Sequence, residues 1–119
     1  AGPPAGAGAP GARGSLEEQA AMPGNEECAD CGARGPDWAS ANLGVRICIV
    51  CAGVHRSLGA HISKVKSLSL DSWKPEEVQA FAALGGNAAV NRRLGPGAAR
   101  PPPGAARDAL ERHIAAKYR

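Results

Sequence analysis

Residues 28–51 decide the fold, because this stretch begins and ends with a pair of cysteines. Residues 28–31 read CADC and residues 48–51 read CIVC, with 16 residues between the two pairs. Each pair can hold a metal ion with two thiolates, and two pairs complete the tetrahedral set of a structural zinc site. Two disulfides or a redox-active C-x-x-C are the alternatives. We predict one structural Zn²⁺ held by Cys28, Cys31, Cys48 and Cys51.

The composition explains why a metal is needed. The chain has 119 residues and is 44% hydrophobic, but 25 of these residues are alanine, and Leu, Ile, Val and Phe together number only 19. A small domain with so few large apolar side chains usually relies on disulfides or a metal. The N-terminus lacks the basic start and apolar stretch of a secretory signal, so we expect a reducing compartment, where metal binding is favoured over disulfides.

The charge argues against two other classes of protein. The formal net charge is +3, and four thiolates on one Zn²⁺ would lower it to about +1. Such a balance does not favour strong non-specific binding to nucleic acid, so we expect no nucleic-acid partner. No apolar run approaches the roughly 20 residues that span a bilayer.

The remaining sequence predicts a tail followed by alternating short elements. Residues 1–14 contain only Ala, Gly, Pro and one Arg, which predicts a disordered tail before a domain over residues 15–119. Ser15 and Glu18 have the spacing of a capping box, so the first helix is expected over 15–22. Asn87 is expected to cap a later helix. We expect strands over 44–47 and 64–70, helices over 49–58, 75–84, 87–94 and 108–118, and a loop over 95–106.

Three side chains follow the second cysteine pair closely. Because four cysteines already fill a closed zinc site, we interpret His55 and His61 as structural or surface residues. Arg56 lies five residues after Cys51, a rotation of about 500°, which turns it roughly 140° away from the metal-facing side of a helix. Arg56 should therefore project from a helix that the zinc holds in place, where an arginine is usually only a solvated charge.

The combined pattern C-x₂-C-x₁₆-C-x₂-C-x₄-R, from Cys28 to Arg56, resembles the signature of the Arf GTPase-activating protein (ArfGAP) domain. The strings PDWAS (36–40), NLGV (42–45), CAGVHRSLG (51–59) and HISKVKSLSLDSW (61–73) are similar to that domain as well, and a weaker likeness continues to the C-terminus. The resemblance implies a small α/β (α+β) domain, a Cys₄ zinc finger with a short central sheet surrounded by helices.

The resemblance also implies a function in GTPase activation. The family accelerates GTP hydrolysis on Arf-family small GTPases in their GTP form, with the arginine at the position of Arg56 as the arginine finger. Trp38, Ile49, Leu70 and Asp71 match positions that the family associates with activity. We expect Trp38 and Leu70 to pack and shape the surface, Ile49 to meet the GTPase, and Asp71 to orient Arg56 or contact the partner. Core packing or capping is the alternative for each.

The nucleotide would then belong to the partner. The sequence contains no G-x-x-x-x-G-K-[ST] loop, so GTP and its Mg²⁺ are expected on the GTPase. By the resemblance we expect a monomer that acts in trans in vesicle trafficking. We expect it to be cytoplasmic and peripheral to Golgi, endosomal or plasma membranes, near the membrane through its partner.

Some positions depart from the family pattern, and two other functions stay open. Arg46 stands where the family usually has an aromatic residue, and Leu94–Gly95 replaces an aromatic–Glu pair. His113 and Ala115 weaken the match at the aromatic and basic positions expected in the last helix. These departures concern the C-terminal packing. The alternatives are a catalytically silent ArfGAP-like scaffold and a GATA-like DNA-binding finger. The second needs a basic helix after the second cysteine pair, but residues 52–58 carry a single arginine.

Overall fold

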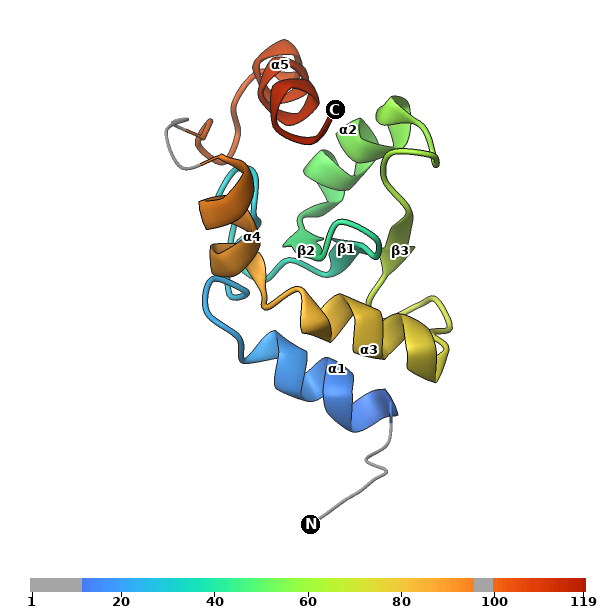
Figure 1. Cartoon of the computed structure of the whole chain (residues 1–119). Helices are drawn as coiled ribbons and strands as arrows, with labels where there is room; N and C mark the ends of the chain where they lie inside the picture. The colour runs from blue at the N-terminus through green and yellow to red at the C-terminus, as the bar shows by residue number, and fades with distance from the viewer. Residues whose placement is uncertain (1–11, 96–99) are drawn as a thin grey trace.

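A three-stranded antiparallel sheet lies at the centre of the computed structural model, which describes residues 12–95 and 100–119 (Figure 1). β1 is the middle strand and pairs with β2 on one side and β3 on the other. This short sheet with surrounding helices confirms the predicted fold class. The elements in chain order are α1 (Ala12–Ala20), β1 (Trp38–Ser40), β2 (Val45–Ile47), α2 (Ile49–Leu58), β3 (Val65–Ser67), α3 (Pro75–Ala83), α4 (Asn87–Leu94) and α5 (Arg107–Tyr118).

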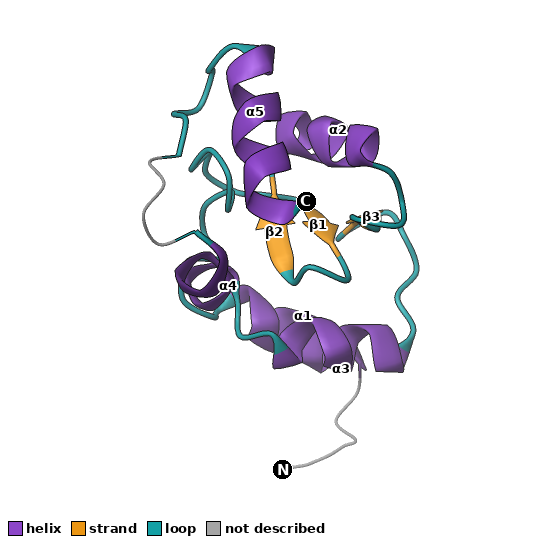
Figure 2. Cartoon of the chain, turned by 45° about the horizontal axis from the view of Figure 1, so that its top comes forward, coloured by secondary structure: helices purple, strands orange, loops and turns teal. Residues whose placement is uncertain are grey.

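The helices form two layers on either side of the sheet. α2 and α5 contact each other on one side, α1 and α3 pack together on the other, and α4 lies beside β2 (Figures 1 and 2). The main hydrophobic cluster lies largely in the α2–α5 layer and includes three of the four cysteines. This confirms that the core is thin, because sulfur atoms fill positions that a larger domain would give to aliphatic side chains.

The strand predicted over 64–70 is shorter than expected. β3 ends at Ser67, whose hydroxyl oxygen accepts hydrogen bonds from the backbone N–H groups of Ser69 (3.2 Å) and Leu70 (2.9 Å). The carboxylate of Asp71 accepts another from the N–H of Ser67 at 2.7 Å. These bonds satisfy the backbone in a turn, so Leu70 lies in that turn and does not continue a strand face.

The central strand β1 was missing from the sequence prediction. It is only three residues long, and Trp38-Ala39-Ser40 shows no alternation of polar and apolar side chains that would predict a strand. Ala39 and Ser40 are both fully buried. The Ser40 hydroxyl is tolerated there because it accepts a hydrogen bond from Ser63 and donates one to Asn42.

α1 begins three residues before the predicted helix start at Ser15. Residues 12–14 of the predicted tail are therefore helical, while the disorder predicted for residues 1–11 lies outside the described residues. Arg46 holds this helix: its Nε donates to Gln19 Oε1 at 2.6 Å and its Nη2 to the Leu16 carbonyl at 2.9 Å. The arginine that replaces the family's aromatic residue thus ties α1 to β2.

The sequence predicted that Asn87 caps α4. Its buried side chain instead joins three segments of the chain by hydrogen bonds. Asn87 is the first residue of α4, after the N-cap Gly86, and is 1% exposed. Its Oδ1 accepts from the Arg46 N–H at 2.7 Å, and its Nδ2 donates to the carbonyls of Glu27 (2.8 Å) and Arg46 (3.0 Å). A buried side-chain amide can serve in this way because it both donates and accepts.

α5 docks as its sequence pattern predicted. Leu110 and Ile114 are buried at 2% and 0% exposure, and Tyr118 packs against the same cluster, so the i, i+4, i+8 stripe is confirmed. Ala115, at which the chain departs from the family pattern, also packs against the core. Among the described helices, none is long and apolar enough to cross a bilayer.

Candidate metal centre and arginine surface

The structure brings the four cysteine sulfurs together. Their Sγ atoms all lie within 4.8 Å of one another, and those of Cys31 and Cys48 are 3.7 Å apart. Four ligands at the usual Zn–S distance of about 2.3 Å form a tetrahedron with edges of about 3.8 Å, so the spacing suits this ion. All four cysteines are free thiols, which favours the metal interpretation over two disulfides.

Backbone N–H groups already point at two of the sulfurs. The N–H of Asp30 donates to Cys28 Sγ and that of Cys51 to Cys48 Sγ, both at 3.4 Å. Cys48 is the N-cap of α2, so its sulfur also lies at the positive end of that helix. Both features place partial positive charge beside sulfur atoms that would bind a metal as thiolates.

The thiols cannot all ionise together without a cation. A hydrogen bond from Cys51 lowers the pKa of Cys28 to about 5. Burial, together with the neighbouring cysteines, raises the pKa of Cys31 to about 12, and the bond to Cys28 raises the pKa of Cys51. Ionisation of one thiol thus opposes ionisation of the next. A divalent ion bound to all four sulfurs would stabilise the thiolates together. The residues therefore fit a structural zinc.

Asp30, inside the first cysteine pair, is a buried anion that the sequence analysis did not single out. Its side chain is 0% exposed, and its carboxylate accepts hydrogen bonds from His55 Nε2 (2.7 Å), Lys117 Nζ (2.9 Å) and the Tyr118 hydroxyl (2.7 Å). Burial alone would raise the pKa of this carboxyl, but the bond from His55 and the charge of Lys117 outweigh it and hold the pKa near 2. Asp30 therefore joins the loop of the first cysteine pair to α2 and to α5. The Asp-His-Lys-Tyr set is scattered over 88 residues, so no local pattern reveals it.

His55 belongs to this network and is structural, as predicted. It is fully buried, and its second ring nitrogen, Nδ1, lies 2.8 Å from the Ser63 hydroxyl. Because the Asp30 carboxylate can only accept, Nε2 carries a proton and donates it. His61 is exposed, which matches its interpretation as a surface residue.

Arg56 is exposed although its neighbour His55 is fully buried. This confirms that it points away from the metal-facing side of α2. Its guanidinium carbon lies 4.9 Å from the centre of the Trp38 ring, within cation–π range. Trp38 is half-buried at the start of β1 and so forms a fixed platform beneath the arginine.

The pairing of the strands places the other predicted residues at one end of the sheet. Trp38 pairs with Ile47 at the end of β2 and with Ser67 at the end of β3. Ile49 follows the first of these by two residues, and Leu70 follows the second by three. Ile49 and Leu70 are 68% and 83% exposed. The expectation that Leu70 packs is therefore wrong.

Val50 and Asp71 complete this end of the molecule. Val50 is 52% exposed and adds an apolar side chain that the sequence analysis did not select. Asp71 bonds the backbone of Ser67, which matches the capping alternative, and within the described residues it makes no hydrogen bond to Arg56. An exposed arginine over Trp38 and three exposed aliphatic side chains thus share this end of the molecule, an arrangement suited to another protein's surface.

The sequence profile of the ArfGap family, described as "Putative GTPase activating protein for Arf", matches residues 13–119. The ADP-ribosylation factor GTPase-activating protein AGD12 of Arabidopsis thaliana is 52% identical over 98 residues, which cover 79% of this chain and 29% of that protein. The human Arf-GAP with coiled-coil, ANK repeat and PH domain-containing protein 2 is 46% identical over 109 residues, 87% of this chain and 14% of that protein. This chain therefore spans less than a third of either relative.

Solved structures agree with the sequence comparison. The solution structure of the ArfGap domain of human RIP matches with a TM-score of 0.73 at 26% identity, covering 94% of this chain and 84% of that chain. The crystal structure of a Cryptosporidium parvum protein described as a "putative GTPase activating protein for ADP ribosylation factor" matches with a TM-score of 0.65 at 31% identity, covering 72% of this chain and 68% of that chain. With its profile match, its relatives and its four gathered cysteines, this chain belongs to the ArfGap family.

Proposed function

We propose that this domain stimulates GTP hydrolysis on an Arf-family GTPase by inserting Arg56 into the partner's active site. The observation that carries the proposal is the exposed guanidinium of Arg56, which projects from α2 over Trp38. Membership of the ArfGap family and the names of the relatives support the same activity and partner.

The chemistry asks little more of this chain than an arginine in the right place. Phosphoryl transfer is accelerated mainly by positioning and by stabilising charge on the transferring group. A guanidinium is always charged and presents planar N–H donors that suit phosphate oxygens. GTP and Mg²⁺ would both be bound by the GTPase, so this domain supplies one part of a shared active site.

The surroundings of Arg56 suit that task. Four thiolates on one Zn²⁺ would fix the N-terminal end of α2, and His55 fixes its last turn from inside through Asp30 and Ser63. The Trp38 ring limits where the guanidinium can lie before the partner arrives. A side chain held in this way loses less conformational entropy when it enters the partner's site.

The exposed aliphatic side chains supply a contact surface. Ile49, Val50 and Leu70 are all more than half exposed, and they lie around the same end of the sheet as Trp38. Apolar side chains that a partner buries hold an interface together, while the arginine acts in the transition state. In this proposal Asp71 positions Leu70 through its bond to the Ser67 backbone.

Single-turnover GTP hydrolysis by a soluble Arf protein tests the proposal. Arg56→Lys keeps the charge but loses the planar fork, and we expect stimulation to fall by about 10³–10⁵, the range of arginine fingers in other GTPase systems. That range corresponds to about 4–7 kcal/mol of barrier. Arg93→Lys, at an exposed position in the last turn of α4, is the matched control and should stay within about twofold.

The same assay distinguishes the alternatives. An Arg56→Lys variant that retains stimulation within about threefold would show that Arg56 is not the finger, since loss of an arginine finger lowers the hydrolysis rate by several powers of ten. A wild-type domain that binds the GTP-loaded partner without stimulating it would indicate the silent scaffold. We further propose that the domain acts as a monomer in the cytoplasm, at membranes to which its partner is attached.

A further inference from the structure

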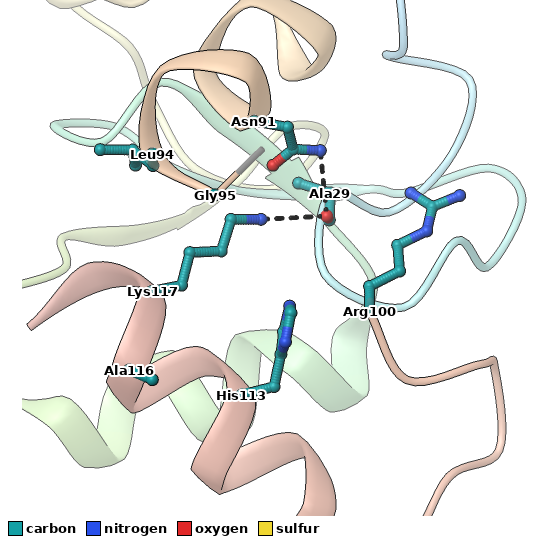
Figure 3. Close-up of a pocket in the computed structure, with 8 residues that line it drawn as sticks. All are labelled: Ala29, Asn91, Leu94, Gly95, Arg100, His113, Ala116 and Lys117. Carbon is teal, nitrogen blue, oxygen red and sulfur yellow. Dashed lines mark hydrogen bonds between the residues drawn. The ribbon is translucent and has the colours of Figure 1, made fainter. Parts of the chain in front are cut away.

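A cavity of about 220 Å³ lies between α4, α5 and the first cysteine pair (Figure 3). It shares no residue with the zinc ligands or with the surface around Arg56. A cavity of this size is smaller than typical pockets for drug-sized ligands, which measure about 300–1,000 Å³. The side chains and backbone that matter here belong to Ala29, Asn91, Leu94, Arg100, His113 and Lys117.

Two buried polar atoms at this cavity have no hydrogen-bond partner. They are Oδ1 of Asn91 and Nε2 of His113, and Figure 3 shows both side chains directed into the space. The Asn91 Nδ2 donates to the Ala29 carbonyl at 3.2 Å, which fixes the amide so that Oδ1 is the atom left over. Leaving such atoms unpaired is costly, and native structures contain few of them. Of the three in the described part of the chain, two line this one cavity.

Among the described residues, two cations at the cavity, Lys117 and Arg100, keep N–H hydrogens that no hydrogen bond uses. Lys117 Nζ donates to the Ala29 carbonyl (3.2 Å) and to Asp30 (2.9 Å), which leaves one of its three hydrogens. Arg100 donates to the Cys28 carbonyl (3.3 Å) and to Glu27 (2.7 Å), which leaves three of its five. These donors carry positive charge, so they favour an oxygen ligand with negative charge.

The nearby carboxylates do not remove this preference. Glu27 is partly exposed and engages only one N–H of Arg100. Asp30 already accepts three hydrogen bonds, from His55, Lys117 and Tyr118. His113 is neutral near pH 7, because burial lowers the pKa of its imidazole. It can therefore place its single proton on Nε2 and donate it into the cavity.

We propose that this cavity binds a small oxyanion that also carries a hydroxyl, of the hydrogen-phosphate kind. Its charged oxygens would accept hydrogen bonds from Lys117, Arg100 and His113, while its hydroxyl would donate to Asn91 Oδ1. The hydroxyl belongs either to the phosphate itself or to a small polyol esterified to it. The site is additional to the proposed GTPase-activating function and does not depend on it.

The unpaired acceptor makes a sharp distinction between two similar ions. Hydrogen phosphate keeps a proton at neutral pH, whereas sulfate has the same shape and a similar charge but no proton. Sulfate would leave Asn91 Oδ1 unpaired against an anionic oxygen, so it should bind at least about tenfold more weakly than phosphate. A merely electropositive surface would not discriminate between the two ions in this way.

The experiment is an NMR titration of the zinc-loaded whole chain with inorganic phosphate, and in parallel with sulfate at equal ionic strength. We expect saturable shifts of the Asn91, Gly95 and Lys117 amides with a dissociation constant on the order of millimolar or tighter, as suits a ligand of five heavy atoms. A third titration, with glycerol 3-phosphate, shows whether the site takes the free ion alone or phosphorylated polyols as well. No saturation with phosphate, or equal shifts with sulfate, overturns the proposal.

Two variants and a control locate the binding. Asn91→Leu removes the acceptor and should abolish the preference for phosphate over sulfate, while Arg100→Gln should weaken phosphate binding by about tenfold. Arg112→Gln removes a cation from the same helix as His113, but from a 72% exposed position paired with Asp108, and should stay within about twofold. If Asn91→Leu fails to fold, Arg100→Gln still decides. Wild-type binding in Arg100→Gln overturns the proposal.

Discussion

His55 and Arg56 are neighbours in the last turn of α2, yet the two faces of the helix give them opposite surroundings. His55 is fully buried between Asp30 and Ser63, whereas Arg56 is exposed above Trp38. The inner face is bound to the cysteine cluster and to α5, and on the outer face the Arg56 guanidinium lies over the Trp38 ring. A helix with a 100° step per residue allows this separation between consecutive positions.

Stability and the proposed activity therefore depend on different sides of one helix. Changes on the inner face should alter the free energy of unfolding and leave the arginine surface intact once the protein is folded. Changes on the outer face should do the reverse.

Removing the metal should have the greatest effect. Structural zinc contributes roughly 10 kcal/mol or more in small domains, and the core here is thin, so a chelator or Cys31→Ser should unfold the protein. Metal analysis should find close to one zinc per chain, and circular dichroism should report the loss of structure. A well-folded, metal-free protein in excess chelator would contradict the prediction.

The next largest effect should come from Asp30→Asn. The substitution keeps the shape but removes the charge that pairs with Lys117 and accepts from His55, and breaking a buried pair costs about 3–5 kcal/mol. Denaturant unfolding of the zinc-loaded protein measures this loss. Asp108→Asn, which alters an exposed pair on α5, is the control and should leave the unfolding midpoint almost unchanged.

The activity of the same variant tests the separation directly. At a temperature where Asp30→Asn is still folded, stimulation of GTP hydrolysis should stay close to that of the wild type, because Arg56 and Trp38 are untouched. A variant that is folded and zinc-loaded but inactive would show that the two faces of α2 are coupled.

The sequence predicted most of the fold because its strongest signals are local. The cysteine spacing, the Pro75 start and the Gly85–Gly86 end of α3, and the apolar stripe of α5 each depend on residues close together in the chain. β1 was missed because a three-residue strand is too short to show a period. Asp30 and Asn87 were missed as buried hubs because their partners lie up to 88 and 63 residues away.

The residues of the candidate site likewise differ in whether the local sequence predicts them. The gathering of the four cysteines follows from their spacing alone, and the outward direction of Arg56 follows from the geometry of a helix. The surroundings of Leu70 could not be predicted, because its exposure depends on the Ser67 and Asp71 hydrogen bonds that end β3 early. The cavity between α4 and α5 depends on side chains from three separate segments, so it becomes visible only in the folded chain.

The smallest effect should be a pH dependence that comes from His113. Burial lowers the pKa of this imidazole in the folded protein, while the unfolded chain has the ordinary value of about 6.5. Above that value both states are neutral and folding is not penalised. As the pH falls below it, the unfolded state takes up a proton that the folded state resists, so stability decreases.

His113→Gln isolates this contribution, because glutamine does not titrate. Urea unfolding at pH 7.5 and pH 5.5, in phosphate-free buffer with zinc present, should show the wild type losing more stability than the variant on acidification. Both proteins share the cysteine cluster, so any effect of pH on metal binding cancels in the difference. Arg112→Gln keeps His113 and should lose as much stability as the wild type. Equal losses in the wild type and His113→Gln would show that the buried ring does not oppose protonation.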